Sequence, residues 1–367
     1  MTLAPDRLTA AETARLMARF EAAGAVSVDA PMLLPAETLL DLYGEDIRGR
    51  AYVTRDPVAG ELMLRPDFTV PVVQMHMASG AEPARYAYAG TVFRMQEAGS
   101  DRPNEYAQVG FELFDGGDAA AAEAEVFALF SDMLAPLDLR AATGDMGLLM
   151  AAVGGLRTSA ARKAALLRHV WRPRRFRALL DRFCGRTPVP EARAALLARV
   201  AAGEDVMADA GPVIGSRGAD EIARRVAALA ADAAEPPIAP RERALLDDLM
   251  AIEETAPNAL EHLRDLAVDL PAIRPAVERM AARIEALRAR GVNVDALDFE
   301  ASFGRTALEY YDGFVFGFYV PGRPDLPPVA TGGRYDALTR VLGGGRAIPA
   351  VGGVIRPALT AELGGTA

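Results

Sequence analysis

The chain has 367 residues, more than a single hydrophobic core usually contains, so we expect a large core with a subsidiary lobe. Its composition, 51% hydrophobic and 25% charged, is ordinary for a globular protein, and it holds no apolar run of membrane-spanning length. The single cysteine, Cys184, has no disulfide partner in the chain, and the N-terminus lacks the layout of a signal peptide. A cytoplasmic location is therefore expected.

The net charge of −10 argues against a nucleic-acid surface, because binding phosphates takes clustered cations. The most basic stretch, WRPRRFR at 171–177, is read more simply as a solvated helix face. With three scattered histidines and one cysteine, no metal site is expected. No phosphate-binding glycine loop with its lysine occurs, and no cofactor is expected.

The first elements form a helix followed by a strand. Thr9 and Glu12 make a capping box, and apolar residues recur at helical spacing until Gly24. The segment that follows alternates apolar and polar residues and stops at Pro31, which predicts a short strand. Further strands are expected at 61–65, 84–95 and 105–114, with a helix at 69–79.

The strands at 84–95 and 105–114 are separated by a polar stretch, which predicts an antiparallel hairpin with a long loop. In its second strand, Val109 and Phe111 fall on one face, which we expect to be buried. Gln108 and Glu112 fall on the opposite face. That face is too polar for a core.

Residues from about 118 to 290 change character, because Ala, Leu and Arg dominate and helical periodicity replaces strand patterns. Strand signals return at 292–302, 307–320 and 350–355. The predicted fold class is α+β: one antiparallel sheet built from both ends of the chain and flanked by helices, with a mainly helical insertion. We place a discontinuous core at 1–154 and 266–367, and the insertion lobe at 155–265.

A few polar residues interrupt these apolar strands or stand at their ends, and they are the candidate site: Asp67, Arg94, Gln108, Glu112, Tyr310 and Tyr311. Two carboxylates and an arginine on one face of a sheet suit a zwitterion, since the acids accept an ammonium and the guanidinium takes a carboxylate. The alternative is that Arg94 and Glu112 simply pair across neighbouring strands. The residues alone leave both open.

Four segments, at 64–73, 93–112, 308–319 and 332–353, resemble in order and spacing the core of histidyl-tRNA synthetase. The segment at 93–112 fits motif 2 of the class II aminoacyl-tRNA synthetases without a gap. The resemblance implies a class II synthetase-like fold with a six-stranded antiparallel sheet. It also implies a dimer formed through the first helix and the strand that ends at Pro31.

Three departures from the synthetase pattern concern ATP chemistry. Thr306 stands where the family has an arginine that promotes adenylate formation, Gln96 replaces an adenine-contacting glutamate, and Leu359 replaces the ATP-binding arginine of motif 3. Arg305 is one residue away from the first of these positions, and on a strand it would point to the opposite face. Because adenylyl transfer depends on positioned cations, ATP activation is expected to be abolished.

The resemblance implies that the amino-acid pocket is retained. By position, Asp67 corresponds to the ammonium-binding acid, which is a glutamate in the synthetase, and Arg94 to the motif 2 arginine. Gln108 and Glu112 correspond to further substrate contacts, and Tyr310 and Tyr311 to the tyrosines around the imidazole. The chain stops soon after motif 3, so no anticodon-binding domain is expected.

A synthetase core with these features is similar to the regulatory subunits of ATP phosphoribosyltransferase. The resemblance implies a non-catalytic protein that the short catalytic subunit needs for activity, and that mediates feedback inhibition by L-histidine in the first step of histidine biosynthesis. The implied partners are that catalytic subunit, L-histidine and further copies of this chain within a hetero-oligomer. An active or degenerate histidyl-tRNA synthetase and a stand-alone histidine sensor stay open as alternatives.

Overall fold

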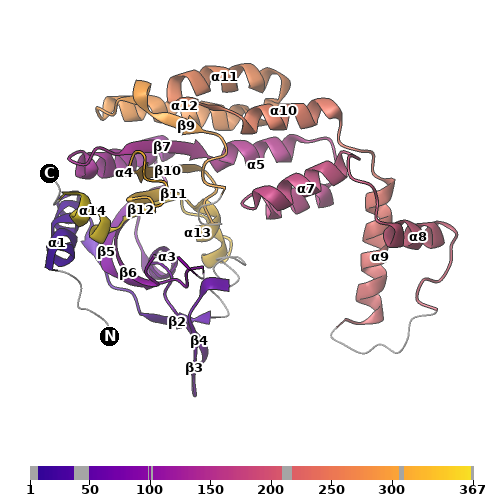
Figure 1. Ribbon diagram of the computed structural model, residues 1–367, viewed down its shortest axis with the longest axis horizontal. Coiled ribbons are helices and arrows are strands. Elements are labelled where there is room, and N and C mark those ends of the chain that lie inside the picture. The colour runs from indigo at the N-terminus through magenta and orange to yellow at the C-terminus, as the bar shows by residue number, and fades with distance from the viewer. Residues whose placement is uncertain are drawn as a thin grey trace.

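The computed structural model describes residues 7–36, 49–97, 99–100, 102–208, 217–305 and 310–364. Its centre is a nine-stranded sheet in the order β1-β5-β6-β12-β11-β10-β7-β9-β8, beside a three-stranded sheet in the order β2-β4-β3 (Figure 1). The strands are β1 (Val26–Ser27), β2 (Leu33–Pro35), β3 (Val53–Asp56), β4 (Gly60–Leu64), β5 (Ala84–Phe93), β6 (Glu105–Phe114), β7 (Arg140–Asp145), β8 (Glu253–Thr255), β9 (Asp298–Glu300), β10 (Phe314–Tyr319), β11 (Ala330–Arg334) and β12 (Ala350–Ile355).

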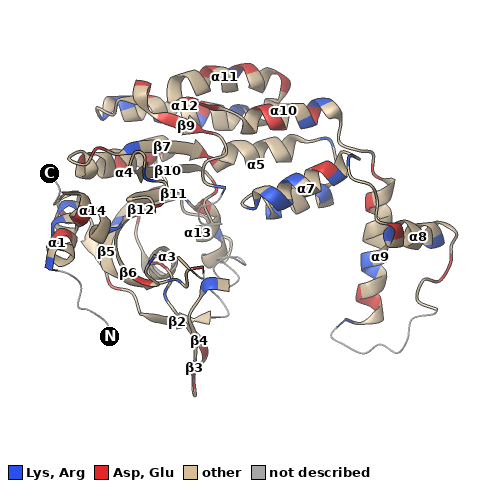
Figure 2. Cartoon of the chain, viewed as in Figure 1, with Lys and Arg blue, Asp and Glu red and all other residues tan. Residues whose placement is uncertain are grey.

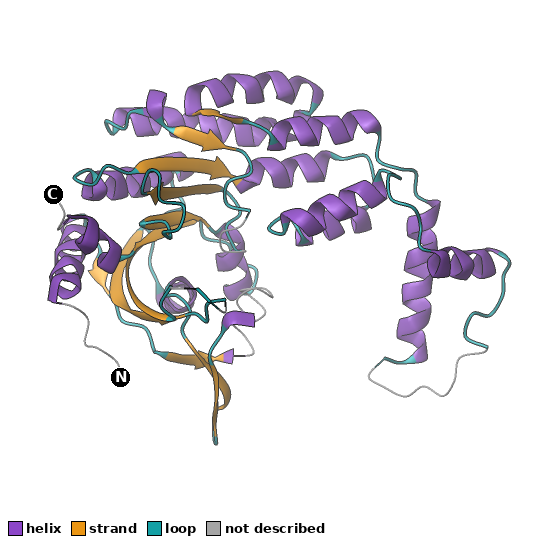
Figure 3. Cartoon of the chain, viewed as in Figure 1, coloured by secondary structure: helices purple, strands orange, loops and turns teal. Residues whose placement is uncertain are grey.

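Helices surround the large sheet and make up most of the middle of the chain (Figure 3). They are α1 (Arg7–Ala22), α3 (Thr69–Ser79), α4 (Ala119–Leu134), α5 (Met146–Gly155), α6 (Ala160–Arg168), α7 (Pro173–Phe183), α8 (Glu191–Ala201), α9 (Ala219–Ala234), α10 (Pro240–Met250), α11 (Ala256–Asp269), α12 (Arg274–Ala289), α13 (Asp336–Leu342) and α14 (Pro357–Gly364), with 3-10 turns at Pro271–Ile273 and Val294–Ala296. No helix in the described ranges is both long enough and apolar enough to cross a membrane.

The six central strands, β5, β6, β12, β11, β10 and β7, pair antiparallel throughout. This confirms the antiparallel sheet built from both ends of the chain. Short strands extend it at the margins: β1 runs parallel to β5, β9 runs parallel to β7, and β8 pairs antiparallel with β9. The predicted hairpin is confirmed as β5 and β6, which pair from Ala84 with Phe114 to Phe93 with Glu105.

The sheet has one face that packs against helices and one that lines a cavity. On β10, Phe314, Phe316 and Phe318 have ring centroids 5.5–6.1 Å from that of Phe127 on α4. On β6, Phe111 is 5.3 Å from Phe20 of α1 by the same measure. Strand alternation sends the intervening residues to the opposite face.

The opposite face of β6 is also buried, contrary to the prediction that it is too polar for a core. Gln108 and Glu112 are each only 1% exposed. Tyr88 and Tyr335, fully buried themselves, donate to Glu112, and α3 lies within the curve of the sheet on this side (Figure 1). Polar strand residues are therefore covered here by groups that hydrogen-bond them.

The strand predicted at 307–320 is shorter in the structure, because β10 begins only at Phe314. Tyr310 and Tyr311 precede it outside regular structure, and Thr306 lies outside the described residues. The expectation that Arg305 sits on a strand is wrong: it lies in a series of turns after β9, and its side chain points into the helical part of the molecule.

Two helices of the middle region, α8 and α9, extend away from the rest of the described chain (Figure 1). Neither contains a buried residue. Asp232 of α9 holds this pair in place, with carboxylate oxygens 2.7 Å from Arg162 Nε and 2.8 Å from Arg193 Nη2. The range expected for the insertion, 155–265, also takes in β8, and the division into a core and an insertion lobe stays a prediction.

Candidate functional site

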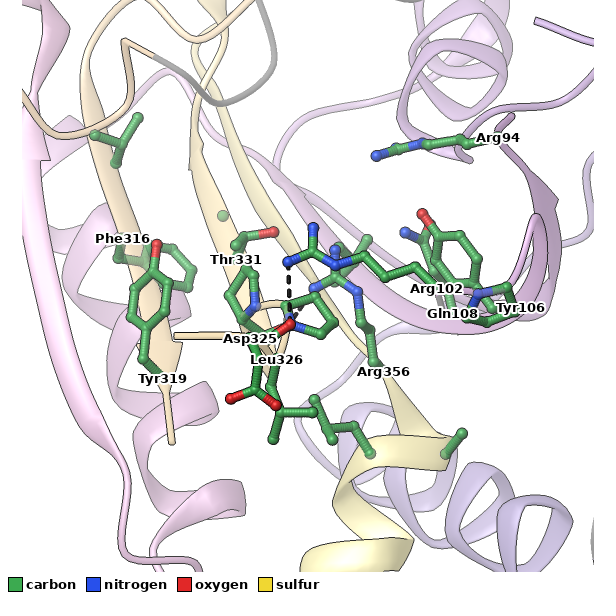
Figure 4. A pocket seen from close by; sticks show the side chains of 18 of the residues that line it. Arg94, Arg102, Tyr106, Gln108, Phe316, Tyr319, Asp325, Leu326, Thr331 and Arg356 are labelled. Carbon is green, nitrogen blue, oxygen red and sulfur yellow. Dashed lines mark hydrogen bonds between the residues drawn. The ribbon is translucent and has the colours of Figure 1, made fainter. Parts of the chain in front are cut away.

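A cavity of about 1020 Å³ opens on the face of the sheet that carries Gln108 and Tyr319 (Figure 4). Of the six predicted site residues, Arg94, Gln108 and Tyr311 line it. Asp67, Glu112 and Tyr310 are not among its lining residues and lie buried, with 5% exposure or less. The predicted set therefore divides into a cavity wall and a layer behind it.

Asp67 and Arg94 meet where two chain segments turn toward the cavity. Asp67 lies between β4 and α3, and Arg94 follows directly after β5. Arg94 Nη2 is 3.9 Å from Asp67 Oδ2, and Arg94 Nε donates to the main-chain oxygen of Pro66 at 2.7 Å. Arg94 therefore pairs with Asp67. It does not form the cross-strand pair with Glu112 that was the alternative interpretation.

Glu112 accepts hydrogen bonds from three hydroxyl groups. Thr69 and Tyr88 donate to Oε1 at 2.9 and 2.8 Å, and Tyr335 donates to Oε2 at 2.6 Å. Burial raises the pKa of Glu112 to about 7, although the three hydroxyls favour the charged form. Burial therefore favours the protonated form of this carboxyl group more than it would be favoured in water.

The two tyrosines connect the cavity wall to this buried carboxylate. The ring centroids of Tyr310 and Tyr311 are 5.0 Å apart, and Tyr310 is 6.1 Å from Tyr335, which donates to Glu112. Burial, with the negative charges of Glu112 and Asp67, raises the pKa of Tyr311. The structure therefore brings the tyrosines and both acids into one cluster.

Gln108 supplies a free acceptor at the inner wall of the cavity. Its side chain is 1% exposed, and its Oε1 has no hydrogen-bond partner among the residues that the structure describes. A buried carbonyl oxygen without a donor costs free energy, on the order of 1–3 kcal/mol. An ammonium or N–H group bound in the cavity would satisfy this oxygen.

Sequence reasoning missed Thr69, Tyr88 and Tyr335, which complete the hydrogen bonding of Glu112. The pairing of β5 with β6 indicates one of them. Tyr88 is opposite Gly110, which lies midway between Gln108 and Glu112 on the same face of β6. A Cβ atom at Gly110 would lie 2.3 Å from the ring of Tyr88, so the glycine makes room for the tyrosine.

Arg102 and Arg356 lie beside Asp325 in another part of the cavity (Figure 4). Arg356 stands over the Tyr106 ring at 5.9 Å and donates to the main-chain oxygen of Pro328. Burial and the nearby charges of Arg94 and Arg102 lower the pKa of Arg356. Arginines that repel one another in this way favour an anionic group in the cavity.

Two of the three positions where the sequence departs from the synthetase pattern also lie at this cavity. Gln96 and Leu359 are among its lining residues. Gln96 Oε1 accepts from Arg50 Nη2 at 3.2 Å, and Leu359 is buried. Neither side chain offers a charge to an adenine or a phosphate.

Comparison with known proteins agrees with this geometry. The family model for histidyl-tRNA synthetase matches residues 3–235 and 219–358. The fold is that of a histidyl-tRNA synthetase from Nostoc sp., with a TM-score of 0.63 at 16% identity over 97% of this chain and 73% of that one. It is also that of an ATP phosphoribosyltransferase regulatory subunit/histidyl-tRNA synthetase from Bacillus halodurans, with a TM-score of 0.68 at 21% identity over 97% and 79%.

Relatives closer in sequence decide between these two names. A protein from Sinorhizobium medicae is 34% identical over 92% of this chain and 93% of its own, and one from Brucella anthropi is 32% identical over 89% of each. Both are named ATP phosphoribosyltransferase regulatory subunit. This chain belongs to that family. The family assignment and the class II synthetase-like fold inferred from the sequence are thereby confirmed, while the ligand roles of the six residues stay a prediction.

Proposed function

We propose that this chain is a non-catalytic subunit that the short catalytic subunit of ATP phosphoribosyltransferase requires for activity, and that it conveys feedback inhibition by L-histidine. The observation that supports the proposal is a cavity lined by Arg94, Gln108 and Tyr311 in a member of the regulatory-subunit family, where Gln96 and Leu359 stand at the positions that correspond to ATP contacts of the synthetase. The pathway would be histidine biosynthesis, and the location the cytoplasm.

L-Histidine fits the chemistry of the pocket at each end. Arg94 would offer its guanidinium to the ligand carboxylate, the free oxygen of Gln108 would accept from the ammonium, and Asp67 behind the wall would add a negative charge. Tyr311 would face the imidazole, with Tyr310 and Glu112 in the layer behind it. The cavity is larger than one amino acid fills, and the part that holds Arg102 and Arg356 would stay open to solvent or a second group.

The chain would act as a homodimer within a hetero-oligomer. Apolar side chains stand exposed near its N-terminal elements: Leu8 (62%), Val26 (62%), Met32 (49%) and Leu33 (46%). Val26 belongs to β1 at the edge of the large sheet, and exposed strand edges invite pairing with another chain. A second copy at this surface would cover the apolar residues.

The test is to mix purified chain with the short catalytic subunit of the same organism and to measure ATP phosphoribosyltransferase activity with and without L-histidine. The catalytic subunit alone should be nearly inactive, the mixture active, and the active mixture inhibited by histidine. A catalytic subunit that is equally active with and without this chain contradicts the proposal.

Two alternative functions can each be tested by a separate measurement. An active histidyl-tRNA synthetase would catalyse histidine-dependent exchange of pyrophosphate into ATP, whereas we expect none from this chain. A stand-alone histidine sensor would bind histidine in calorimetry but fail to copurify with the catalytic subunit.

A further inference from the structure

Two hydrogen bonds join the helical middle of the chain to the segment that carries the site tyrosines. Trp171 Nε1 donates to the main-chain oxygen of Tyr311 at 3.2 Å. Arg305 Nε donates to the main-chain oxygen of Val170 at 2.9 Å. Val170 and Trp171 are consecutive residues in the junction between α6 and α7. One short junction therefore contacts the chain on either side of the stretch between Arg305 and Tyr311.

Arg305 is held firmly in the helical part of the molecule. It is 6% exposed, its guanidinium carbon is 4.8 Å from the centre of the Phe176 ring on α7, and its Nη1 is 3.3 Å from Met250 Sδ on α10. No carboxylate pairs with it within the described ranges, and burial together with Arg177 lowers its pKa to about 10. A buried cation without a carboxylate costs free energy, so stability alone does not account for Arg305.

The acceptor of the Trp171 bond is a main-chain oxygen, which makes the contact independent of the Tyr311 hydroxyl. The bond fixes the backbone from which the Tyr310 and Tyr311 rings project, and one of these rings lines the cavity. A ligand that moves the Tyr311 backbone together with its ring would alter this bond, because hydrogen bonds weaken steeply as their angle closes. Trp171 is therefore placed to respond to movement of the cavity wall.

The contacts continue from α7 toward α8 and α9, which project from the rest of the described chain (Figure 1). Arg162 of α6 and Arg182 of α7 stand over the Phe183 ring at 5.1 and 4.6 Å. Both arginines also reach the carboxylate of Asp232 on α9, at 2.7 and 3.6 Å. Helix α7, which is rich in basic residues (Figure 2), lies between the tyrosine segment and the projecting helices.

We propose that Trp171 and Arg305 are positioning residues that couple the tyrosine wall of the cavity to helix α7, so that occupation of the cavity by an amino acid is transmitted to the helical insertion. The identity of the ligand rests on the proposed function, whereas the coupling itself rests on these contacts. In this proposal the chain has two conformations that differ in the orientation of the Tyr311 backbone. A ligand shifts their populations because it has a different affinity for each.

Trp171 provides a direct readout because it is the only tryptophan in the chain. Histidine added to the full chain should change the tryptophan emission along a saturating curve, with the dissociation constant that calorimetry gives. The Arg94→Ala variant should show no emission change over the same concentrations. If calorimetry detects binding while the emission stays constant, the coupling is wrong and the proposed function stands.

The Trp171→Phe variant keeps an aromatic ring and loses only the N–H donor. It should bind histidine about fivefold more weakly, the equivalent of about 1 kcal/mol for one hydrogen bond. Histidine should slow hydrogen exchange in residues 173–183 of the wild-type chain but not in this variant. The matched control is Arg174→Ala, an exposed change on α7, with wild-type affinity and exchange. Wild-type behaviour of Trp171→Phe overturns the proposal.

A ligand-free measurement separates failure of the coupling from failure of the proposed function. The Tyr311→Ala variant removes the tyrosine ring, keeps the main-chain acceptor and should shift the emission maximum of Trp171. Tyr319→Ala removes another tyrosine from the cavity wall, away from Trp171, and should leave the emission unchanged. If histidine does not bind the wild-type chain, the proposed ligand is wrong, and constant emission in Tyr311→Ala rejects the coupling in that case too.

Discussion

Glu112 lies across the backbone of Gly352 on the neighbouring strand, so that a Cβ atom at position 352 would be 1.6 Å from Oε2. The two residues are direct partners in the register of β6 and β12. The absence of a side chain at 352 therefore gives the carboxylate the room in which Thr69, Tyr88 and Tyr335 reach it.

Replacement of this glycine should disturb the site and the fold together. Gly352→Ala forces Glu112 away from its three donors, and we expect a loss of about 1–3 kcal/mol in the free energy of unfolding, the usual cost of overpacking a core. Urea denaturation measures it, and histidine affinity should fall as well. Gly154→Ala is the control, because a Cβ there meets nothing within 4 Å. Equal stability of the two variants would refute the steric role of Gly352.

Loss of the Arg94 side chain should weaken histidine binding while the catalytic subunit is still activated. Arg94→Ala leaves Asp67, which is 2% exposed, without its guanidinium, and we expect histidine binding to weaken by about 2–5 kcal/mol. Calorimetry measures the affinity, and the reconstituted enzyme should stay active while its inhibition by histidine is relieved.

The control for this prediction is Arg55→Ala, which removes an exposed arginine from β3 and should bind histidine like the wild type. A complex of the Arg94 variant that remains fully sensitive to histidine would place the inhibitory site elsewhere, most simply at the interface with the catalytic subunit.

Ionisation of Glu112 should lower the free energy of unfolding as pH rises. Its pKa in the folded chain is about 7 against an ordinary 4.5, so the folded state holds the proton more tightly. Its contribution to the free energy of unfolding is fully present below pH 4.5 and is lost as pH rises through about 7, by at most about 3–4 kcal/mol at about 1.4 kcal/mol per tenfold change in the acid constant.

The Glu112→Gln variant should lose this part of the pH dependence, as measured by unfolding at pH 4.5 and pH 7. Asp312, whose pKa is raised to about 6 by burial and by Asp336, keeps a smaller slope of the same sign in the variant. An identical pH profile for variant and wild type would show that Glu112 does not titrate in this range.

The exposed edge at β1 should hold two copies of the chain together. Val26→Glu places a charge on this apolar surface, and we expect the dissociation constant of the dimer to rise by at least about tenfold, a typical effect of one well-placed interface residue. Light scattering over a dilution series measures it. Val189→Glu changes another exposed valine, next to α8, and should leave the dimer intact. A wild-type chain that is already monomeric at micromolar concentration refutes the prediction.

Much of this site could be anticipated from the chain because strand parity is local. Gln108 and Glu112 are four residues apart on a strand, which places them on one face whatever surrounds them. The burial of that face could not be anticipated, since the groups that cover it, Tyr88 and Tyr335, come from a different strand and from the start of a distant helix.

The turn at Arg305 was missed for a related reason. A run of apolar and aromatic residues around it is typical of a strand, but Gly304 has a φ of +92° and turns the chain before β10 begins. The contact of Trp171 with Tyr311 joins segments that no short-range pattern relates. Resemblance to a family located the pocket residues, whereas the residues that position them required the fold.

The interleaving of the two ends of the chain in one sheet has a consequence for synthesis on the ribosome. Strand β6 ends at Phe114, yet its neighbour β12 begins only at Ala350. The hairpin of β5 and β6 must therefore wait, with one edge unpaired, until nearly all of the described chain has been translated. Sheets closed by such distant partners fold slowly and expose aggregation-prone edges meanwhile. We expect the nascent chain to depend on chaperones until β12 emerges and fills the gap between β6 and β11.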